Sequence, residues 1–198
     1  MEIVSQVMDL YAHIDSAVAE FQLKSGLRCP VGCGQCCPTA DVRVTTLEML
    51  PMAHEILCNH DAGDWMDRLG TQPQAGRCAL YSEKRISDAG HCSFYNWRPA
   101  LCRLFGFAAV RSRTGGRAIS VCKYIRQKNP RGAKAAMALA EEAPCFVHYG
   151  AQVYALDPAL GTELMPINMA LRRAIERLGL SLSLAESAPE ATILFPAA

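Results

Sequence analysis

Four cysteines fall within nine residues near the start of the chain, in the segment Cys29-Pro-Val-Gly-Cys33-Gly-Gln-Cys36-Cys37. The proline and glycines of this segment favour an irregular loop over a regular element. Cys33 and Cys36 are separated by two residues, one of them a glycine, so both thiolates can turn onto one metal ion. Adjacent cysteines normally project apart, so the Cys36–Cys37 pair indicates two neighbouring sites, or one ligand beside a spare thiol. The loop predicts a chain that folds around a metal centre.

Cysteine usage and the absence of targeting signals suggest a reducing environment. The chain has 198 residues and 10 cysteines, which is many for a cytosolic protein and few for a secreted disulfide scaffold. Acidic residues interrupt the apolar pattern of the first 24 residues, unlike a secretory signal, and no apolar run of ~18 residues would span a membrane. We therefore expect a cytoplasmic protein without a membrane segment. In that compartment clustered cysteines are metal ligands or redox groups more often than disulfides or inert core thiols.

Periodicity and punctuation predict an α+β fold that is mainly helical. Apolar residues recur at helical spacing over 2–24, and Gly26 ends that pattern. Thr45 and Glu48 have the spacing of a capping box, which predicts a helix to about His60. We also expect a short extended piece at 42–44, a short helix over 63–69, strands over 78–82 and 91–95, a short helix after Pro99, a hairpin over 106–122, and helices over 129–142 and 165–178.

These elements suggest one domain over residues 1–198. An irregular cysteine-rich metal-binding core with a small β-hairpin would occupy about 25–150. N- and C-terminal helices would flank it, as a helix over 2–24 and a helical extension over 151–184. A loose tail would follow over 185–198 because it is rich in proline and alanine.

A second, more widely spaced set of cysteines follows the loop. Cys78 begins a Cys-x-Leu string, Cys92 follows, and Arg98-Pro99 precedes Cys102-Arg103-Leu-Phe. With the Cys36–Cys37 doublet, these strings resemble the YkgJ-type CxxCxxCC family of zinc- or iron-chelating domains over roughly residues 29–125. The first gap, between Cys29 and Cys33, holds three residues where that family has two.

The resemblance implies metal chelation by the motif cysteines, and it implies no particular reaction. The candidate ligands are Cys29, Cys33, Cys36, Cys37, Cys78, Cys92, Cys102 and Cys122. Cys145, which follows Pro144, is either a late ligand or a packed thiol. Zinc and iron–sulfur clusters are both bound by sets of four cysteines, so both cofactors remain open.

Basic residues are concentrated beside these cysteines. The net charge is +1, yet residues 84–134 hold 12 Lys or Arg and a single acid, Asp88. Arg98 and Arg103 flank Cys102 and are candidates for cofactor binding, because a cation beside a thiolate site offsets its negative charge. Two other interpretations remain: the stretch forms a basic face for RNA or another anionic partner, or it is a solvated surface packed against acidic helices.

The sequence therefore predicts a metal-binding protein that holds zinc or an iron–sulfur cluster. A redox or metal-dependent enzyme that uses the same site, with Cys37 as a spare thiol, is one alternative. A nucleic-acid or protein adaptor with a structural metal and a basic face is another. The chain shows no acid–base dyad, nucleotide-binding loop or Ser/His/Asp set, so no catalytic residue is assigned.

Overall fold

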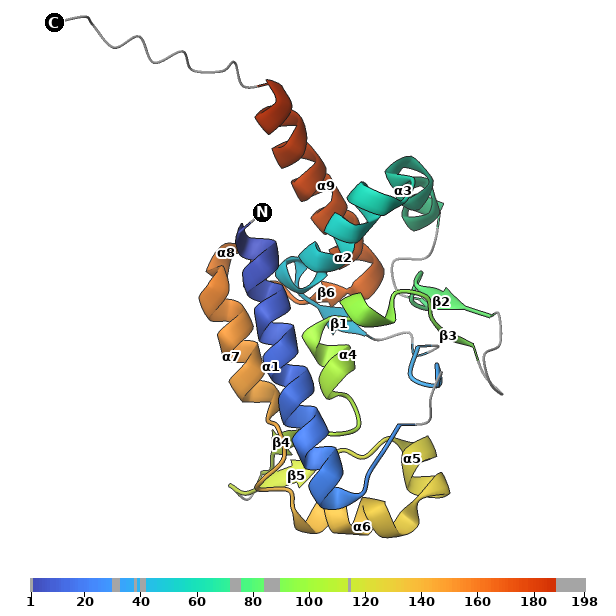
Figure 1. The fold of residues 1–198 in the computed structure, drawn as a ribbon, viewed down its shortest axis with the longest axis vertical. Helices are drawn as coiled ribbons and strands as arrows, with labels where there is room; N and C mark the ends of the chain where they lie inside the picture. The colour runs from blue at the N-terminus through green and yellow to red at the C-terminus, as the bar shows by residue number, and fades with distance from the viewer. Residues whose placement is uncertain are drawn as a thin grey trace, which may run out of the picture.

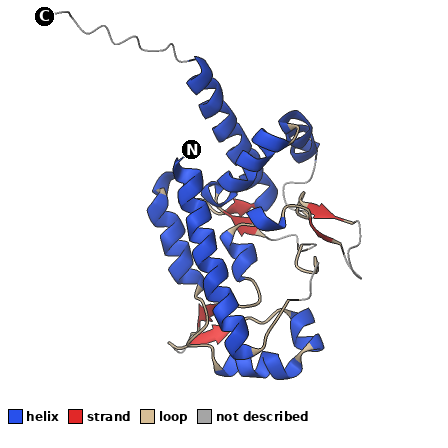
Figure 2. Ribbon diagram, in the orientation of Figure 1, coloured by secondary structure: helices blue, strands red, loops and turns tan. Residues whose placement is uncertain are grey.

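A computed structural model describes residues 2–29, 33–37, 39, 42–71, 76–83, 90–113 and 115–187. Helices make up most of this part of the chain, and short paired strands connect them (Figure 2). The helices are α1 Glu2–Ser25, α2 Thr46–Asn59, α3 Ala62–Thr71, α4 Ala100–Leu104, α5 Lys123–Lys128, α6 Pro130–Ala138, α7 Phe146–Leu156, α8 Pro158–Gly161 and α9 Ile167–Ser187, with a 3-10 turn η1 at Tyr95–Trp97. The mainly helical α+β class expected from the sequence is confirmed.

The N-terminal helix α1 buries one apolar stripe along most of its length. Its buried side chains include Val7, Leu10, Ile14 and Phe21, which repeat at helical spacing. Gly26 follows the helix with a φ of 68°, a backbone conformation that suits glycine because it carries no Cβ. The helix predicted over 2–24 is confirmed.

Helix α2 begins with the predicted capping box. The Thr45 side chain accepts a hydrogen bond from Glu48 N, and the Glu48 carboxylate accepts one from Thr45 N at 2.9 Å. Helix α2 packs along α9 and also contacts α1 (Figure 1). Ala53 on α2 and Ala170 and Ala174 on α9 are wholly buried, which is consistent with a close approach of the two helices.

Three antiparallel strand pairs tie the helices together. Strands β2 Tyr81–Ser82 and β3 His91–Cys92 pair with each other, and β4 Ala109–Arg111 pairs with β5 Arg117–Ile119. The strands and the hairpin predicted in these two segments are confirmed, with shorter strands. Residues 84–89 and Thr114 lie outside the described residues. The third pair joins β1 Arg43–Val44 to β6 Met165–Pro166, which are distant in the chain. The β1 segment was predicted as extended, but sequence reasoning did not supply its partner.

Several element boundaries differ from the predictions. Helices α5, α7 and α8 were not anticipated individually, and α6 ends at Ala138 rather than near 142 because residues 139–142 form turns. Helix α9 runs to Ser187, three residues into the segment expected to be loose. The rest of that tail lies outside the described residues.

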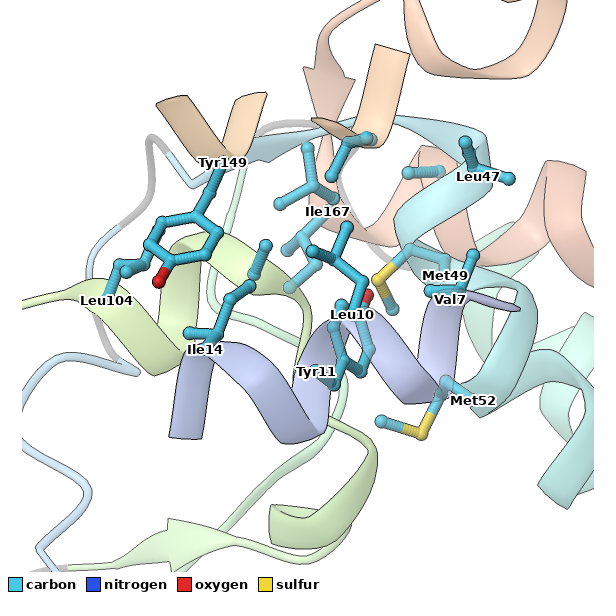
Figure 3. Packing of buried hydrophobic residues seen from close by; sticks show 14 of the residues in the cluster. Val7, Leu10, Tyr11, Ile14, Leu47, Met49, Met52, Leu104, Tyr149 and Ile167 are labelled. Carbon is cyan, nitrogen blue, oxygen red and sulfur yellow. The ribbon is translucent and has the colours of Figure 1, made fainter. Parts of the chain in front are cut away.

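Buried side chains from α1, α2, α4, α7 and α9 meet in one apolar cluster. Figure 3 shows Leu10 of α1 near Met49 of α2 and Ile167 of α9, and Ile14 on the side of Leu104 and Tyr149. The Tyr11 hydroxyl donates a hydrogen bond to Glu48 O at 2.5 Å, which satisfies this buried polar group. None of the described helices combines the length and apolarity needed to cross a bilayer.

Candidate metal centre

The cysteine loop makes a tight turn over residues 33–37 and packs against the strand pair β2–β3. Cys37 N donates to Gly34 O at 3.0 Å, which closes the turn. Gly34 is buried, and a Cβ placed on it would lie 2.0 Å from Gly90 O. Only a residue without a side chain can approach the backbone beside β3 so closely. Gly34 therefore allows Cys36 to lie near Cys92.

The position of Cys78 is fixed by a residue of the C-terminal helix α9. The Asn168 side chain, at the start of α9, accepts from Ala79 N at 2.9 Å and donates to Arg77 O at 3.1 Å, so one amide holds the residues on both sides of Cys78. Tyr81, three residues on, pairs with Cys92 in the β2–β3 register. These contacts bring Cys78 and Cys92 to the same region.

Cys102 is presented by the short helix α4. Its backbone N–H donates to Pro99 O at 3.0 Å, and the helix begins directly after Pro99, as predicted. The buried Glu48 carboxylate accepts a bond from Leu101 N at 3.4 Å, which fixes α4 to α2. The helix that carries Cys102 is therefore hydrogen-bonded to α2, which belongs to the main helical core.

Cys78, Cys92 and Cys102 form a group of interacting thiols around Cys36. Burial raises the pKa of Cys78 to about 12 and also raises the pKa values of Cys92 and Cys102. Negative charge on neighbouring cysteines adds to each of these shifts, and Cys36 contributes to all three. We call Cys78, Cys92 and Cys102 the upper group.

Cys29, Cys33 and Cys122 form a second set, the lower group. The pKa of Cys29 is raised to about 12, first by burial and then by Cys33, with Cys36 and Cys122 adding to the shift. Cys122 precedes α5 and lies close to Gly106. A Cβ added at Gly106 would lie 3.3 Å from Cys122 Cβ. A cavity of about 300 Å³ separates α1 from this group, and its walls include all three lower-group cysteines with Cys36 and Cys102.

The Cys36–Cys37 doublet lies between the two groups, and its two thiols differ in ionisation: Cys36 loses its proton more readily than Cys37 does. A hydrogen bond from Cys37 lowers the pKa of Cys36 to about 6, and Arg98 adds to this effect despite partial burial. The same hydrogen bond, together with burial, raises the pKa of Cys37. Cys36 interacts with cysteines of both groups, whereas Cys37 interacts with Cys78 and Cys92 of the upper group.

The two arginines flanking Cys102 are placed differently. The positive charge of Arg98 lowers the pKa values of Cys36, Cys92 and Cys102, and its guanidinium stacks on the Tyr95 ring at 3.4 Å from the centroid. Arg103 is buried and lines the cavity, but its donors bond to Asp15 and to the carbonyl oxygens of Asn96 and Arg98. Arg98 is therefore the cation that acts on the thiols.

The thiols share a region, yet they are not arranged as a closed coordination shell. All ten cysteines are free thiols. Among the residues that the structure describes, no three histidine, cysteine, aspartate or glutamate side chains converge closely enough to hold one ion. The donor set is nonetheless chemically suited to zinc or iron, since soft thiolates are the preferred ligands of zinc and of iron–sulfur clusters.

Cys145 and Cys58 are the two cysteines that belong neither to a group nor to the doublet. Cys145 precedes α7 and forms a backbone bridge with Ala109. Cys58 is exposed on α2, and its sulfur lies 3.5 Å from His54 Nε2. Among the aromatic residues beside the motif cysteines, Phe105 lines the cavity, whereas Trp97 packs edge-on against Phe94.

Three residues that support the site were missed by sequence reasoning. They are Asn168, which holds the Cys78 segment, Glu48, which anchors α4, and Asp15, which pairs with Arg103. Glu48 was recognised only as part of a capping box. Asn168 and Asp15 are 89 and 88 residues from their partners, and nothing in the local sequence marks such contacts.

Residues 28–131 match the CxxCxxCC family model, which is described as a "Putative zinc- or iron-chelating domain". The matched segment spans more than half of the chain and includes every cysteine of both groups and the doublet. No curated protein and no solved structure matches the chain at the threshold applied. The family description supports metal binding and leaves the identity of the metal open.

Proposed function

Since the chain belongs to the CxxCxxCC family, we propose that it is a metal-binding protein whose motif cysteines hold zinc or an iron–sulfur cluster. One observation carries the proposal. Eight cysteines spread over residues 29–122 gather as an upper group and a lower group on either side of the Cys36–Cys37 doublet, where their thiols act on one another electrostatically. Isolated core cysteines have no reason to collect in this way.

The ionisation of these thiols is suited to a site completed by metal. Cys29 and Cys78 have pKa values raised to about 12, so both are neutral at pH 7 without a cation. A bound metal would displace their protons, and its affinity would therefore fall on acidification. Arg98 offsets part of the negative charge that the thiolates then carry.

Metal analysis and a visible spectrum of anaerobically purified protein test this proposal. Stoichiometric iron and sulfide in a brown protein would establish an iron–sulfur cluster, and stoichiometric zinc in a colourless protein would establish a zinc site. The double variant Cys33→Ser, Cys36→Ser should lose metal and unfold at a lower temperature. Cys58→Ser is the matched control, because Cys58 is an exposed cysteine on α2. Unchanged metal content in the double variant would contradict the proposal.

The cavity favours a second candidate, a redox or metal-dependent enzyme. A catalytic metal site needs an open coordination position and room for a small molecule, and the cavity of about 300 Å³ borders five cysteines. Alkylation with iodoacetamide distinguishes the two candidates. In a closed binding site every motif cysteine of the metal-loaded protein should resist alkylation. Modification of Cys37 with full retention of metal would identify it as a spare thiol and support the enzyme.

A further inference from the structure

One end of the molecule carries a dense and largely unpaired positive charge. Residues 106–140 contain eight Lys or Arg and no acid. Helices α5 and α6 and strands β4 and β5 bring these residues to the same end, opposite the far end of α9 (Figure 1). We define the basic end as the exposed side chains of Arg111, Arg113, Lys123, Arg126, Lys128, Arg131 and Lys134.

The nearby acids are occupied by other cations. Glu141 accepts from Arg117 N at 2.8 Å and pairs with its guanidinium, and Glu142 pairs with Lys24 at 3.2 Å. Within the described residues, none of the seven side chains of the basic end makes an ion pair. The interpretation of this stretch as a surface packed against acidic helices therefore applies to Arg103, which pairs with Asp15 of α1, and not to the basic end.

The cations are held in a fixed arrangement. Lys123 and Arg126 on α5, and Arg131 and Lys134 on α6, are each spaced three residues apart, so each pair shares a helix face. Asn129 lies between the two helices, where its side chain accepts from Gly132 N at 2.9 Å and donates to Gly26 O at 3.0 Å. These bonds tie the start of α6 to the residue that follows α1, so the cations of α5 and α6 are positioned relative to the helical core.

The composition of this surface decides the kind of partner. Protein interfaces are usually built around buried aromatic or apolar residues, and membrane-binding helices need a broad apolar face. On α5 and α6 the buried residues are Ile125, Gly132, Ala133 and Ala136, and the exposed large apolar residues at this end are Met137 on α6 and Val110 on β4. Two apolar side chains on separate elements do not make a broad apolar face, whereas the clustered cations match the evenly spaced phosphates of a nucleic acid.

We propose that the basic end binds the phosphodiester backbone of nucleic acid without reading its sequence. Tyr124 is half-buried with Lys123 over its ring at 4.9 Å, so the basic end presents no open aromatic surface on which bases could stack. The interaction uses none of the motif cysteines, so it stands independently of the proposed metal site. Its affinity should fall steeply as salt rises, because bound phosphates release counterions.

The test is fluorescence anisotropy of a labelled single-stranded oligonucleotide of mixed sequence, titrated with the full-length protein as purified, at salt concentrations from about 50 to about 200 mM. The variant Arg126→Glu, Arg131→Glu should bind at least about tenfold more weakly, and its slope of log affinity against log salt should be about 1.4 smaller, because two contacts are lost. A duplex of the same sequence shows which form of nucleic acid is preferred.

The control is Arg172→Glu, Arg177→Glu on α9, which makes the same change in net charge at exposed positions away from the basic end. It should leave the affinity within about twofold of the unmodified protein, because screening confines these interactions to about 10 Å. Equal weakening in both variants would mean that net charge alone drives binding and would overturn the proposal. So would tighter binding to polyglutamate, or to vesicles of phosphatidylcholine and phosphatidylserine, than to the oligonucleotide at the same salt.

Discussion

Cys36 and Cys37 are neighbours in sequence but opposite in ionisation. The pKa of Cys36 is lowered to about 6 by the hydrogen bond from Cys37, and the pKa of Cys37 is raised. One negative charge is therefore already present between the upper and lower groups near pH 7, with Arg98 beside it. A cation approaching the doublet meets a formed thiolate, whereas the buried thiols around it must still give up protons.

The buried thiols should make the metal-free protein sensitive to alkali. The pKa of Cys78 is about 12 when folded against about 8.5 when unfolded, so its contribution to stability is complete below about pH 8.5 and is lost as pH rises toward 12. We expect the free energy of unfolding to drop by about 2 kcal/mol between about pH 8.5 and about pH 10 from this thiol alone. Urea unfolding with chelator and reductant measures it. In Cys78→Ala this part of the pH dependence should disappear; an unaltered profile would contradict the assignment.

Arg103 and Arg98 should differ in what their removal changes. Arg103→Ala leaves two partly buried carbonyl oxygens without their donors and removes a buried guanidinium, so it should lower the free energy of unfolding by about 2 to 4 kcal/mol. Arg98→Ala removes a more exposed cation, so its main effect should be weaker metal binding at little cost in stability. Chemical denaturation and a competitive chelator titration separate the two. Equal effects of both variants on stability would contradict this division.

Gly34 should be indispensable for the position of the cysteine loop. An alanine Cβ would lie 2.0 Å from Gly90 O, so Gly34→Ala must displace the turn from β3. We expect reduced metal content in this variant even where circular dichroism shows an unchanged helix content. Gly70→Ala is a suitable control because a Cβ there meets nothing within 4 Å. Full metal loading of Gly34→Ala would show that the close approach is not required.

At the scale of elements, helix starts hold the site in place more than helix interiors do. Thr45 and Glu48 cap α2, Glu48 also holds Leu101 N beside Cys102, and Asn168 at the start of α9 holds the Cys78 segment. Because Glu48 belongs to the capping box of α2 and also bonds to α4, formation of α2 helps to position the helix that carries Cys102.

The capping box gives the corresponding prediction. Thr45→Ala removes the side chain that accepts from Glu48 N and should lower the free energy of unfolding by about 1 kcal/mol. Thr162→Ala, an exposed position where the hydroxyl bonds within its own turn, should change it by less than about 0.5 kcal/mol. Denaturant midpoints of both variants are the measurement. A Thr45→Ala protein as stable as the control would mean that α2 is held by packing alone.

At the scale of the whole molecule, α9 is part of the central core and not an appendage. Its inner half packs along α2 and pairs through β6 with β1, while Leu180 and Leu184 on its outer half are exposed. The helices expected to flank a cysteine-rich core thus share one apolar cluster with α4, the helix that presents Cys102.

Two leucines of α9 test this arrangement. Leu171 is 1% exposed, so Leu171→Ala should lower the free energy of unfolding by about 2 to 5 kcal/mol, because it leaves a cavity in the shared cluster. Leu180→Ala, at a position 61% exposed on the same helix, should change it by less than about 0.5 kcal/mol. Thermal unfolding of both variants measures the two losses of stability. Similar losses would indicate that the outer half of α9 is buried in solution.

The sequence by itself determined the local features. Helical periodicity placed α1, the Thr45–Glu48 spacing placed the start of α2, and the Gly/Pro-rich loop with its doublet identified the metal-binding chemistry. These signals arise from residues within one or two turns of each other, where backbone sterics and hydrogen bonding act directly.

Tertiary structure decided the rest. The division of the cysteines into upper and lower groups, the β1–β6 pair, the placement of Cys78 by Asn168 and the pairing of Arg103 with Asp15 all join residues far apart in the chain. Such contacts form because packing of the shared apolar cluster brings their backbones together, and no local pattern encodes that distance. Residue type thus specified which chemistry the chain carries, and the packing of the helices specified which thiols meet.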